Sequence, residues 1–264
     1  MKIILTTFAI GLAAGIFGGI IGVGGGIIMI PLMVVVLKLS QHQAHGTSLL
    51  ALVFTGLGGA IVYGLHGEIS FPAAGMLALT AIVTARAGAR CANALPDWKL
   101  RKVFGAFLVG CALLLTAKPY LPSFGGPHPF YADALIFLVT GACAGFLSGM
   151  MGVGGGVIMI PAMVLLADFS QHVAQGTALA VVIPVGLAGA FTHHQFGNVA
   201  KPYLPGLICG IFLGAFIGGS SANLIADASL RVVFIVVIAL MGLRYLQADA
   251  LSPLPKEDGD SKAP

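Results

Sequence analysis

Ten apolar segments, separated by short polar or glycine-rich stretches, follow one another along the chain. The first five cover about residues 3–21, 27–39, 46–65, 71–90 and 103–117, and the next five about 132–151, 157–169, 176–194, 202–220 and 231–247. A helix needs about 20 residues to cross the hydrocarbon core of a bilayer. The third and fourth segments of each set are long enough, the fifth are slightly short, and the second, at about 13 residues, cannot cross alone. The pattern predicts an all-α polytopic membrane protein.

The two sets of segments are copies of one sequence unit. Residue i resembles residue i+130 without a gap over most of the length, and GVGGGIIMIP from Gly22 matches GVGGGVIMIP from Gly152. Between residues 11–50 and 141–180, about 22 of 40 positions are identical. We therefore expect four parts: a first transmembrane repeat (1–117), an external linker (118–131), a second transmembrane repeat (132–247) and a disordered cytoplasmic tail (248–264).

The placement of charge orients the segments, because basic residues favour the cytoplasmic side of a membrane. The loop between the fourth and fifth segments is flanked by Arg86, Arg90, Lys99, Arg101 and Lys102, which places it inside. Lys2 and Lys38 also belong inside, so the chain must turn back between them, at residues 22–26. The loop 221–230 has no basic residue and contains Asp227, which places it outside. The prediction is two inverted repeats, each a broken membrane hairpin plus three transmembrane helices.

Composition agrees with a membrane protein and argues against a soluble domain, a disulfide-stabilised protein and a thiolate metal protein. Of the 264 residues, 58% are hydrophobic and 8% are charged, and the mean hydropathy is +1.02. A soluble domain carries about 25% charged residues. The four cysteines, at 91, 111, 143 and 209, are scattered, which disfavours a disulfide framework or a thiolate metal site. We expect membrane lipid as a partner, and no nucleic acid, metal or cofactor.

The two G-V-G-G-G stretches are the first candidate site. Each lies at a predicted break in a membrane hairpin and precedes a helical segment, whose first backbone N–H groups have no partner within the helix. Glycine lets an anion approach such N–H groups closely. The candidate donors are the N–H groups of Gly24, Gly25, Gly26, Gly154, Gly155 and Gly156. The alternative is that these glycines only allow close helix packing.

A second motif, S-Q-H-x-x-x-G-T, occurs once in each repeat. Its polar side chains can donate hydrogen bonds to an oxyanion, and the candidates are His45, Thr47, Gln175 and Thr177. His45 is also the candidate for proton coupling, because histidine titrates near neutral pH. The alternative is local capping, for which Ser40 and Ser170 are suited. His193 and His194 are expected to lie at the membrane interface.

Prolines and acidic residues complete the list of candidates. Pro31 and Pro161 lie within the short second segments, where they should kink the helix and act as hinges. The acidic residues Glu68, Asp133, Asp168 and Asp227 all lie near segment ends, which argues against a pump driven by carboxylates within the membrane. No spacing typical of a hydrolase or a metalloenzyme is present, so we expect a protein that is not an enzyme.

These motifs resemble those of the TauE/SafE sulfite exporter family, also called the toluene sulfonate uptake permease family. The resemblance rests on G-x-G-G-G-x-x-x-x-P followed by H-x-x-x-G-T in both halves, and it covers residues 1–246. It implies an inner-membrane transporter of a bacterium or archaeon, with two membrane hairpins and a homodimeric assembly. The implied substrates are small sulfur-containing anions such as sulfite, thiosulfate and organosulfonates.

The sequence thus predicts a transporter that moves a small sulfur anion by alternating access, with export as the expected direction. Two alternatives stay open. One is an anion channel with a fixed pore, and the other is a membrane sulfur-relay protein or enzyme, which would need a reactive cysteine.

Overall fold

The computed structural model describes residues 2–92, 97–117 and 130–247, and in these ranges it is built of helices. The first repeat contains α1 (Lys2–Ile21), α2 (Gly26–Val36), α3 (Gln41–Leu65), α4 (Phe71–Cys91) and α5 (Asp97–Ala117). The second contains α6 (Phe130–Met151), α7 (Gly156–Leu166), α8 (Gln171–Gln195), the short 3-10 helix η2 (Lys201–Tyr203), α9 (Leu204–Ala222) and α10 (Asp227–Gln247). The predicted all-helical class is confirmed.

The helices α3 and α8 begin about five residues earlier than the hydrophobic pattern predicts. Ser40 accepts a hydrogen bond from the Gln43 N–H at 3.2 Å, and the Gln43 side chain accepts one from the Ser40 N–H, which completes a capping box. Ser170 caps α8 by accepting a hydrogen bond from the Val173 N–H, and valine cannot return the second bond of a capping box. The expected capping role of these two serines is confirmed, and the polar S-Q-H motif starts each helix rather than preceding it.

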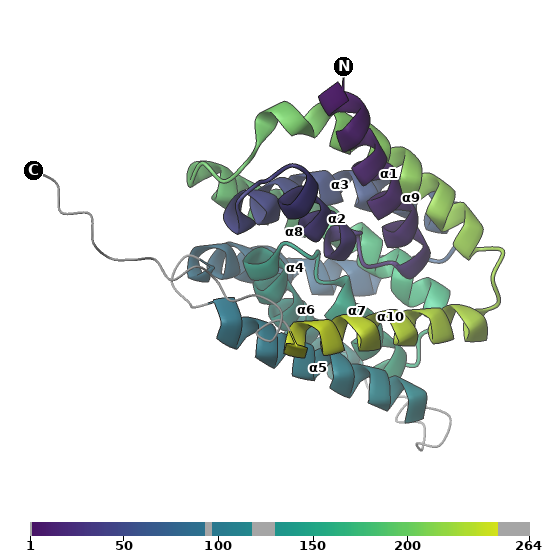
Figure 1. Cartoon of the computed structure of the whole chain (residues 1–264). Helices are drawn as coiled ribbons and strands as arrows, with labels where there is room; N and C mark the ends of the chain where they lie inside the picture. The colour runs from purple at the N-terminus through teal and green to yellow at the C-terminus, as the bar shows by residue number, and fades with distance from the viewer. Residues whose placement is uncertain (1, 93–96, 118–129, 248–264) are drawn as a thin grey trace, which may run out of the picture.

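Helices of one repeat pack mainly against helices of the other. α1 lies along α9, and α6 lies along α4. In Figure 1, purple α1 runs beside green α9, and yellow α10 runs beside α5. Glycines allow the first contact: a methyl group at Gly19 would lie 2.5 Å from the Ala215 carbonyl oxygen, and one at Gly214 2.8 Å from the Ile16 N. Small residues that let backbones approach closely are typical of helix contacts in membranes.

The paired central helices α3 and α8 are antiparallel. The Thr47 hydroxyl, near the start of α3, accepts a hydrogen bond at 2.9 Å from the Ala200 N–H, just beyond the end of α8. The equivalent Thr177 accepts one at 3.0 Å from the Ser70 N–H, just beyond the end of α3. Equivalent helix ends therefore lie at opposite ends of this helix pair. The inverted orientation of the two repeats in the bilayer stays a prediction.

Six helical segments in the described part of the chain are long and apolar enough to cross a membrane. They lie within α1, α3, α4, α6, α8 and η2 with α9. α2 and α7 have 11 residues each, about 16 Å of helix, which is too short. α5 contains only a shorter apolar stretch, Leu108–Ala117, so a membrane crossing by the fifth segments stays a prediction. Large apolar side chains are exposed on the surface of the protein, where lipid would cover them, among them Leu5, Leu79, Val83, Leu135 and Phe191.

Two predicted parts fall mainly outside the described residues. They are the linker, of which 118–129 is not described, and the tail 248–264.

Candidate functional site

The glycine stretches form the tips of two helical hairpins. α1 ends at Ile21 and α2 begins at Gly26, while α6 ends at Met151 and α7 begins at Gly156. The turns need a left-handed backbone: φ is 77° at Gly22, 89° at Gly24 and 81° at Gly25, and it is 68°, 91° and 74° at the equivalent Gly152, Gly154 and Gly155. Residues with a Cβ rarely adopt such angles, so glycine is required at these positions. We call residues 22–26 tip 1 and residues 152–156 tip 2.

The two tips touch each other in the interior of the protein. A methyl group at Gly26 would lie 2.6 Å from the Gly152 carbonyl oxygen, and a methyl group at Gly156 would lie 2.7 Å from the Gly22 carbonyl oxygen. Both tips are buried throughout. Beside them, Leu52 of α3 and Val182 of α8 approach Gly24 and Gly154. The turns that sequence analysis selected in each repeat are therefore brought together at one place.

Backbone N–H groups at both tips lack hydrogen-bond partners. Among the described residues, no hydrogen bond uses the N–H groups of residues 23–27 or of residues 153–157. Buried backbone N–H groups are nearly always paired, so ten unpaired ones at a single contact are unusual. Each set includes the start of a helix, where the dipole is positive. This arrangement suits an anion.

Gln175 of α8 lies directly against tip 1. A methyl group at Gly22 would lie 2.6 Å from the Gln175 Cβ. The Gln175 side chain is fully buried, and its Oε1 accepts a hydrogen bond from the Tyr63 hydroxyl at 2.9 Å. Its Nε2 has no partner. Gln175 thus places a further unpaired donor group beside the unpaired N–H groups of tip 1.

His45 of α3 holds the equivalent place against tip 2. A methyl group at Gly152 would lie 3.0 Å from the His45 Cα and 2.7 Å from the Ser48 Oγ. The buried Ser48 hydroxyl lies 2.8 Å from the His45 carbonyl oxygen and 2.9 Å from the Gly152 carbonyl oxygen, so it can donate to either. Ser48 could not be predicted from the repeat, because only one copy has a hydroxyl there and Ala178 holds the equivalent position.

Thr47 and Thr177 do not face the tips with their hydroxyl oxygens. Both side chains are fully buried, and both oxygens accept hydrogen bonds from Ala200 or Ser70 of the opposite repeat. The structure therefore separates the six glycines, His45 and Gln175, which lie at the tip contact, from the two threonines. The threonines join the ends of α3 and α8 to the segments that follow the partner helix.

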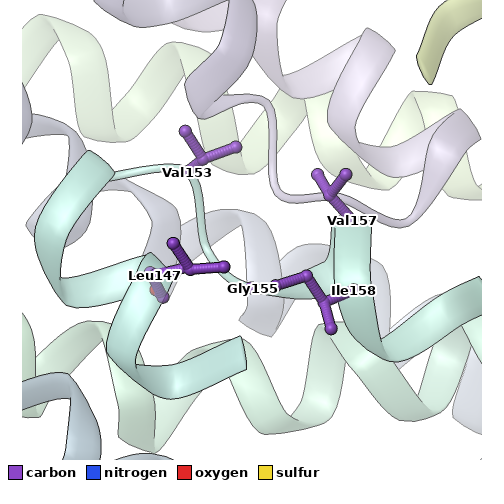
Figure 2. Close-up of a pocket in the computed structure, with 6 residues that line it drawn as sticks. Leu147, Val153, Gly155, Val157 and Ile158 are labelled. Carbon is purple, nitrogen blue, oxygen red and sulfur yellow. The ribbon is translucent and has the colours of Figure 1, made fainter. Parts of the chain in front are cut away.

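A small pocket lies at the turn of the second hairpin. It is lined by Leu147, Ser148, Val153, Gly155, Val157 and Ile158. Figure 2 labels all of these residues but the serine, and they are grouped about the turn between α6 and α7. The pocket has room for one water molecule at most, and the buried Ser148 hydroxyl has no partner. A sulfur oxyanion would fit here only after the surrounding segments move apart.

The two proline hinge candidates lie in the short helices that follow the tips. Pro31 is the sixth residue of α2 and Pro161 is the sixth residue of α7. A proline in a helix interior removes one backbone hydrogen bond. Each short helix thus has a weak point one and a half turns after its tip, and a hinge function for the two prolines stays a prediction.

Two buried groups that sequence analysis did not select lie next to the ends of α1 and α6. The Tyr63 hydroxyl lies 3.2 Å from the Gly19 carbonyl oxygen and 2.9 Å from Gln175 Oε1, so it can donate to either. At the equivalent position of the second repeat, His193 Nε2 lies 3.0 Å from the Gly149 carbonyl oxygen. The His193 side chain is fully buried within the protein, and its place at the cytoplasmic interface of the membrane stays a prediction. The sequence does hold a hint of both residues, because the two repeats differ in residue type at this position: tyrosine in the first and histidine in the second.

A cluster of charged and polar groups lies at the start of α8. His172 Nδ1 is 3.1 Å from Asp227 Oδ1, its Nε2 is 3.2 Å from the Ala222 carbonyl oxygen, and Arg231 is 3.2 Å from Asp227. Glu68 belongs to the same region, and burial raises the pKa of its carboxyl above the usual value, with the neighbouring histidines acting in the opposite direction. The equivalent of Glu68 in the second repeat is the uncharged Asn198.

The described residues offer no group of three or more histidine, cysteine or acidic side chains that could hold a metal ion. The four cysteines are free thiols, and only Cys111 is buried. The chemistry of the tip contact is therefore that of hydrogen-bond donors and a histidine.

Known protein families and relatives match nearly the whole length of the chain. The family model described as "Sulfite exporter TauE/SafE" matches residues 7–245. The chain is similar to the probable membrane transporter protein YunE of Bacillus subtilis, with 26% identity over 90% of this chain and 95% of the relative. It is also similar to YdhB of the same organism, with 27% identity over 93% and 100%, and to MJ0441 of Methanocaldococcus jannaschii, with 24% identity over 90% and 93%. All three are named probable membrane transporter proteins. No solved structure matches the chain.

Proposed function

Because the chain belongs to the sulfite exporter TauE/SafE family and is an integral membrane transporter, we propose that it carries a small sulfur-containing anion across the inner membrane. The candidates are sulfite, thiosulfate and organosulfonates such as sulfoacetate, with export as the direction and the C-terminal tail in the cytoplasm. The observation that carries this proposal is the pair of buried tips, where the backbone N–H groups of residues 23–27 and 153–157 are unpaired.

The proposed site lies between the two tips. The N–H groups of Gly24–Gly26 and Gly154–Gly156 bind the oxygens of the anion, and the positive ends of α2 and α7 stabilise its charge. Gln175 Nε2 and the His45 ring add donors from either side. Thr47 and Thr177 act by positioning α3 and α8 through their contacts with Ala200 and Ser70. Neutral donors suit a transported anion, since a fixed positive charge would bind it tightly and slow its release.

Alternating access follows from the same contact. The tips touch, so an anion enters between them only when one hairpin moves away from the other. Because each hairpin belongs to one of two inverted repeats, movement of one tip opens a path to one side of the membrane and movement of the other opens the opposite path. Pro31 and Pro161 allow α2 and α7 to bend during this movement.

The test is flux in proteoliposomes across sulfite, thiosulfate, sulfoacetate, taurine and sulfate. We expect saturable flux of one or more of the first three, with counterflow when the same anion is present on both sides. Ohmic unitary currents without counterflow would show a channel instead. If none of the five anions moves, and none protects the protein against thermal unfolding, the proposed substrate class is wrong.

A further inference from the structure

We propose that the transporter couples the anion to a proton, and that the buried imidazole of His193 carries this proton through its Nδ1 atom. The inference rests on the proposed anion transport and adds the coupling ion and its binding residue. It begins from the observation that His193 is fully buried, that its Nε2 lies 3.0 Å from the Gly149 carbonyl oxygen, and that its Nδ1 has no partner.

The contact with Gly149 fixes which nitrogen is free. A carbonyl oxygen only accepts hydrogen bonds, so Nε2 must carry a hydrogen and donate it. In the neutral ring, Nδ1 is then a bare acceptor, and it is the atom that takes up a proton. Gly149 lies in the last turn of α6, three residues before tip 2 begins, where helix carbonyl groups lack partners and the dipole is negative. Positive charge on His193 is favoured at this end of the helix.

No carboxylate among the described side chains compensates a charge on His193. Facing it from α3 are His42 and the segment around His45, and a methyl group at Gly46 would lie 2.9 Å from the His193 Cβ. On α8 its neighbour His194 is exposed, as are Arg86 and Arg90 at the end of α4 and Lys201 beyond α8. On α6 the acidic residue is Asp133, 16 residues before Gly149 and about 24 Å along the helix. Glu68 and Asp227 lie with His172 at the other end of α8, and Asp168 comes three residues before α8 begins at that end.

Because no carboxylate balances a charge on His193, the proton on His193 and the anion at tip 2 stabilise each other. A buried imidazolium without an anion is costly, and so is a buried anion without a cation, but the two together offset each other. An anion held at tip 2 therefore increases the affinity of His193 for a proton, and by linkage the proton increases the affinity for the anion. The proton binds Nδ1 from one side of the membrane and leaves from the other with the anion, and only the Nδ1–H bond forms and breaks.

The first repeat supplies the matched variant. Tyr63 holds the position equivalent to His193 and can donate to the Gly19 carbonyl oxygen as His193 does to Gly149. Substitution His193→Tyr therefore keeps a donor for Gly149 and removes the titrating nitrogen. His193→Gln does the same with a smaller side chain, in case tyrosine does not fit. His194→Gln, one residue on and exposed, is the control.

The experiment measures thiosulfate flux and internal pH together in proteoliposomes at clamped membrane potential. Thiosulfate does not titrate between about pH 5 and 8, where histidine does, so any pH dependence belongs to the protein. In the unaltered protein and in His194→Gln, thiosulfate entry acidifies the interior and is about fivefold faster at the acidic end of this range. In His193→Tyr and His193→Gln, flux at acidic pH falls to the level of the unaltered protein at alkaline pH, loses its pH dependence and no longer carries protons.

Three other results would each overturn a different part of the proposal. Thiosulfate flux without proton movement in the unaltered protein overturns the coupling and leaves the proposed transport intact. Protons that still accompany thiosulfate in a folded His193 variant overturn the assignment to His193. Absence of thiosulfate flux at every pH in the unaltered protein overturns transport of this anion, and the coupling with it.

Discussion

The two hairpin tips have the same glycine sequence and the same backbone turns, but they meet different side chains. Tip 1 lies against Gln175, which is held by Tyr63. Tip 2 lies against His45, is bound by the Ser48 hydroxyl, and has His193 where the first repeat has Tyr63. The backbone that we propose binds the anion is thus duplicated, whereas the histidines and the Ser48 hydroxyl occur at tip 2 alone. In this proposal, tip 1 offers neutral hydrogen-bond donors and tip 2 exchanges the proton.

The largest expected effect comes from removing what the tips share. Gly26→Ala and Gly156→Ala each place a methyl group less than 3 Å from a carbonyl oxygen of the other tip, without requiring a left-handed backbone. We expect at least a tenfold loss of flux for either variant, with a loss of about 1–3 kcal/mol in the free energy of unfolding from overpacking. Proteoliposome flux and denaturant unfolding measure the two effects.

Gly75→Ala is the matched control for these substitutions. Gly75 lies in α4, and a methyl group there would meet nothing within 4 Å. This variant should transport normally and be stabilised by about 0.5–1 kcal/mol, since alanine favours a helix. Unchanged flux in Gly26→Ala or Gly156→Ala would show that the contact between the tips is not needed for transport.

Gln175→Glu tests the neutral side of the comparison. The substitution keeps an oxygen that can accept from Tyr63 and replaces the unpaired Nε2 donor with an acceptor. A carboxylate beside tip 1 repels an anion when ionised, so we expect a tenfold or greater rise in the substrate concentration needed for half-maximal flux. Gln175→Leu lacks both the donor and the charge, so its half-maximal concentration should lie between those of the unaltered protein and Gln175→Glu. Half-maximal concentrations equal to that of the unaltered protein would remove Gln175 from the site.

Much of this arrangement was predictable from the sequence, and the reason is periodicity. The repeat at 130 residues, the apolar segments and the break at GVGGG depend on local backbone preference and hydrophobicity, so the helices and the two turns could be predicted. The contact of His193 with the Gly149 carbonyl oxygen could not be predicted, because it is set by the packing of α8 against α3 and α6. The orientation of Thr47 and Thr177 toward the opposite repeat also depends on contacts between segments more than 100 residues apart.

A moderate effect is expected from removing or adding a hydroxyl that hydrogen-bonds to a tip. Ser48→Ala removes the hydroxyl that contacts the Gly152 carbonyl oxygen, and Ala178→Ser places a hydroxyl at the equivalent position beside tip 1. We expect Ser48→Ala to lower the free energy of unfolding by about 1 kcal/mol and Ala178→Ser to raise it by a similar amount. Flux should rise a few-fold in Ser48→Ala and fall a few-fold in Ala178→Ser, because a tip held by a hydrogen bond moves less readily. Equal flux in both variants would argue against tip movement as the slow step.

The smallest effect concerns Glu68, whose equivalent is Asn198. Its pKa is raised by burial, so the folded protein binds the proton more tightly than the unfolded chain does. Stability from this group is therefore greatest at acidic pH and falls as pH rises from the unfolded pKa, about 4.3, through the raised value. Glu68→Gln should flatten this part of the profile of melting temperature against pH. The same slope in both proteins would show that Glu68 ionises as freely in the folded state as in the unfolded one.

The central claim is that the anion binds between the two tips, and it can be tested by locating a heavier analogue. Selenite has the shape and charge of sulfite, and its selenium scatters anomalously. In crystals of the transporter soaked in selenite, the account predicts an anomalous peak within hydrogen-bond reach of the N–H groups of Gly24–Gly26 and Gly154–Gly156. A peak at another place would contradict the account. So would the absence of a peak at a selenite concentration that fully inhibits sulfite flux.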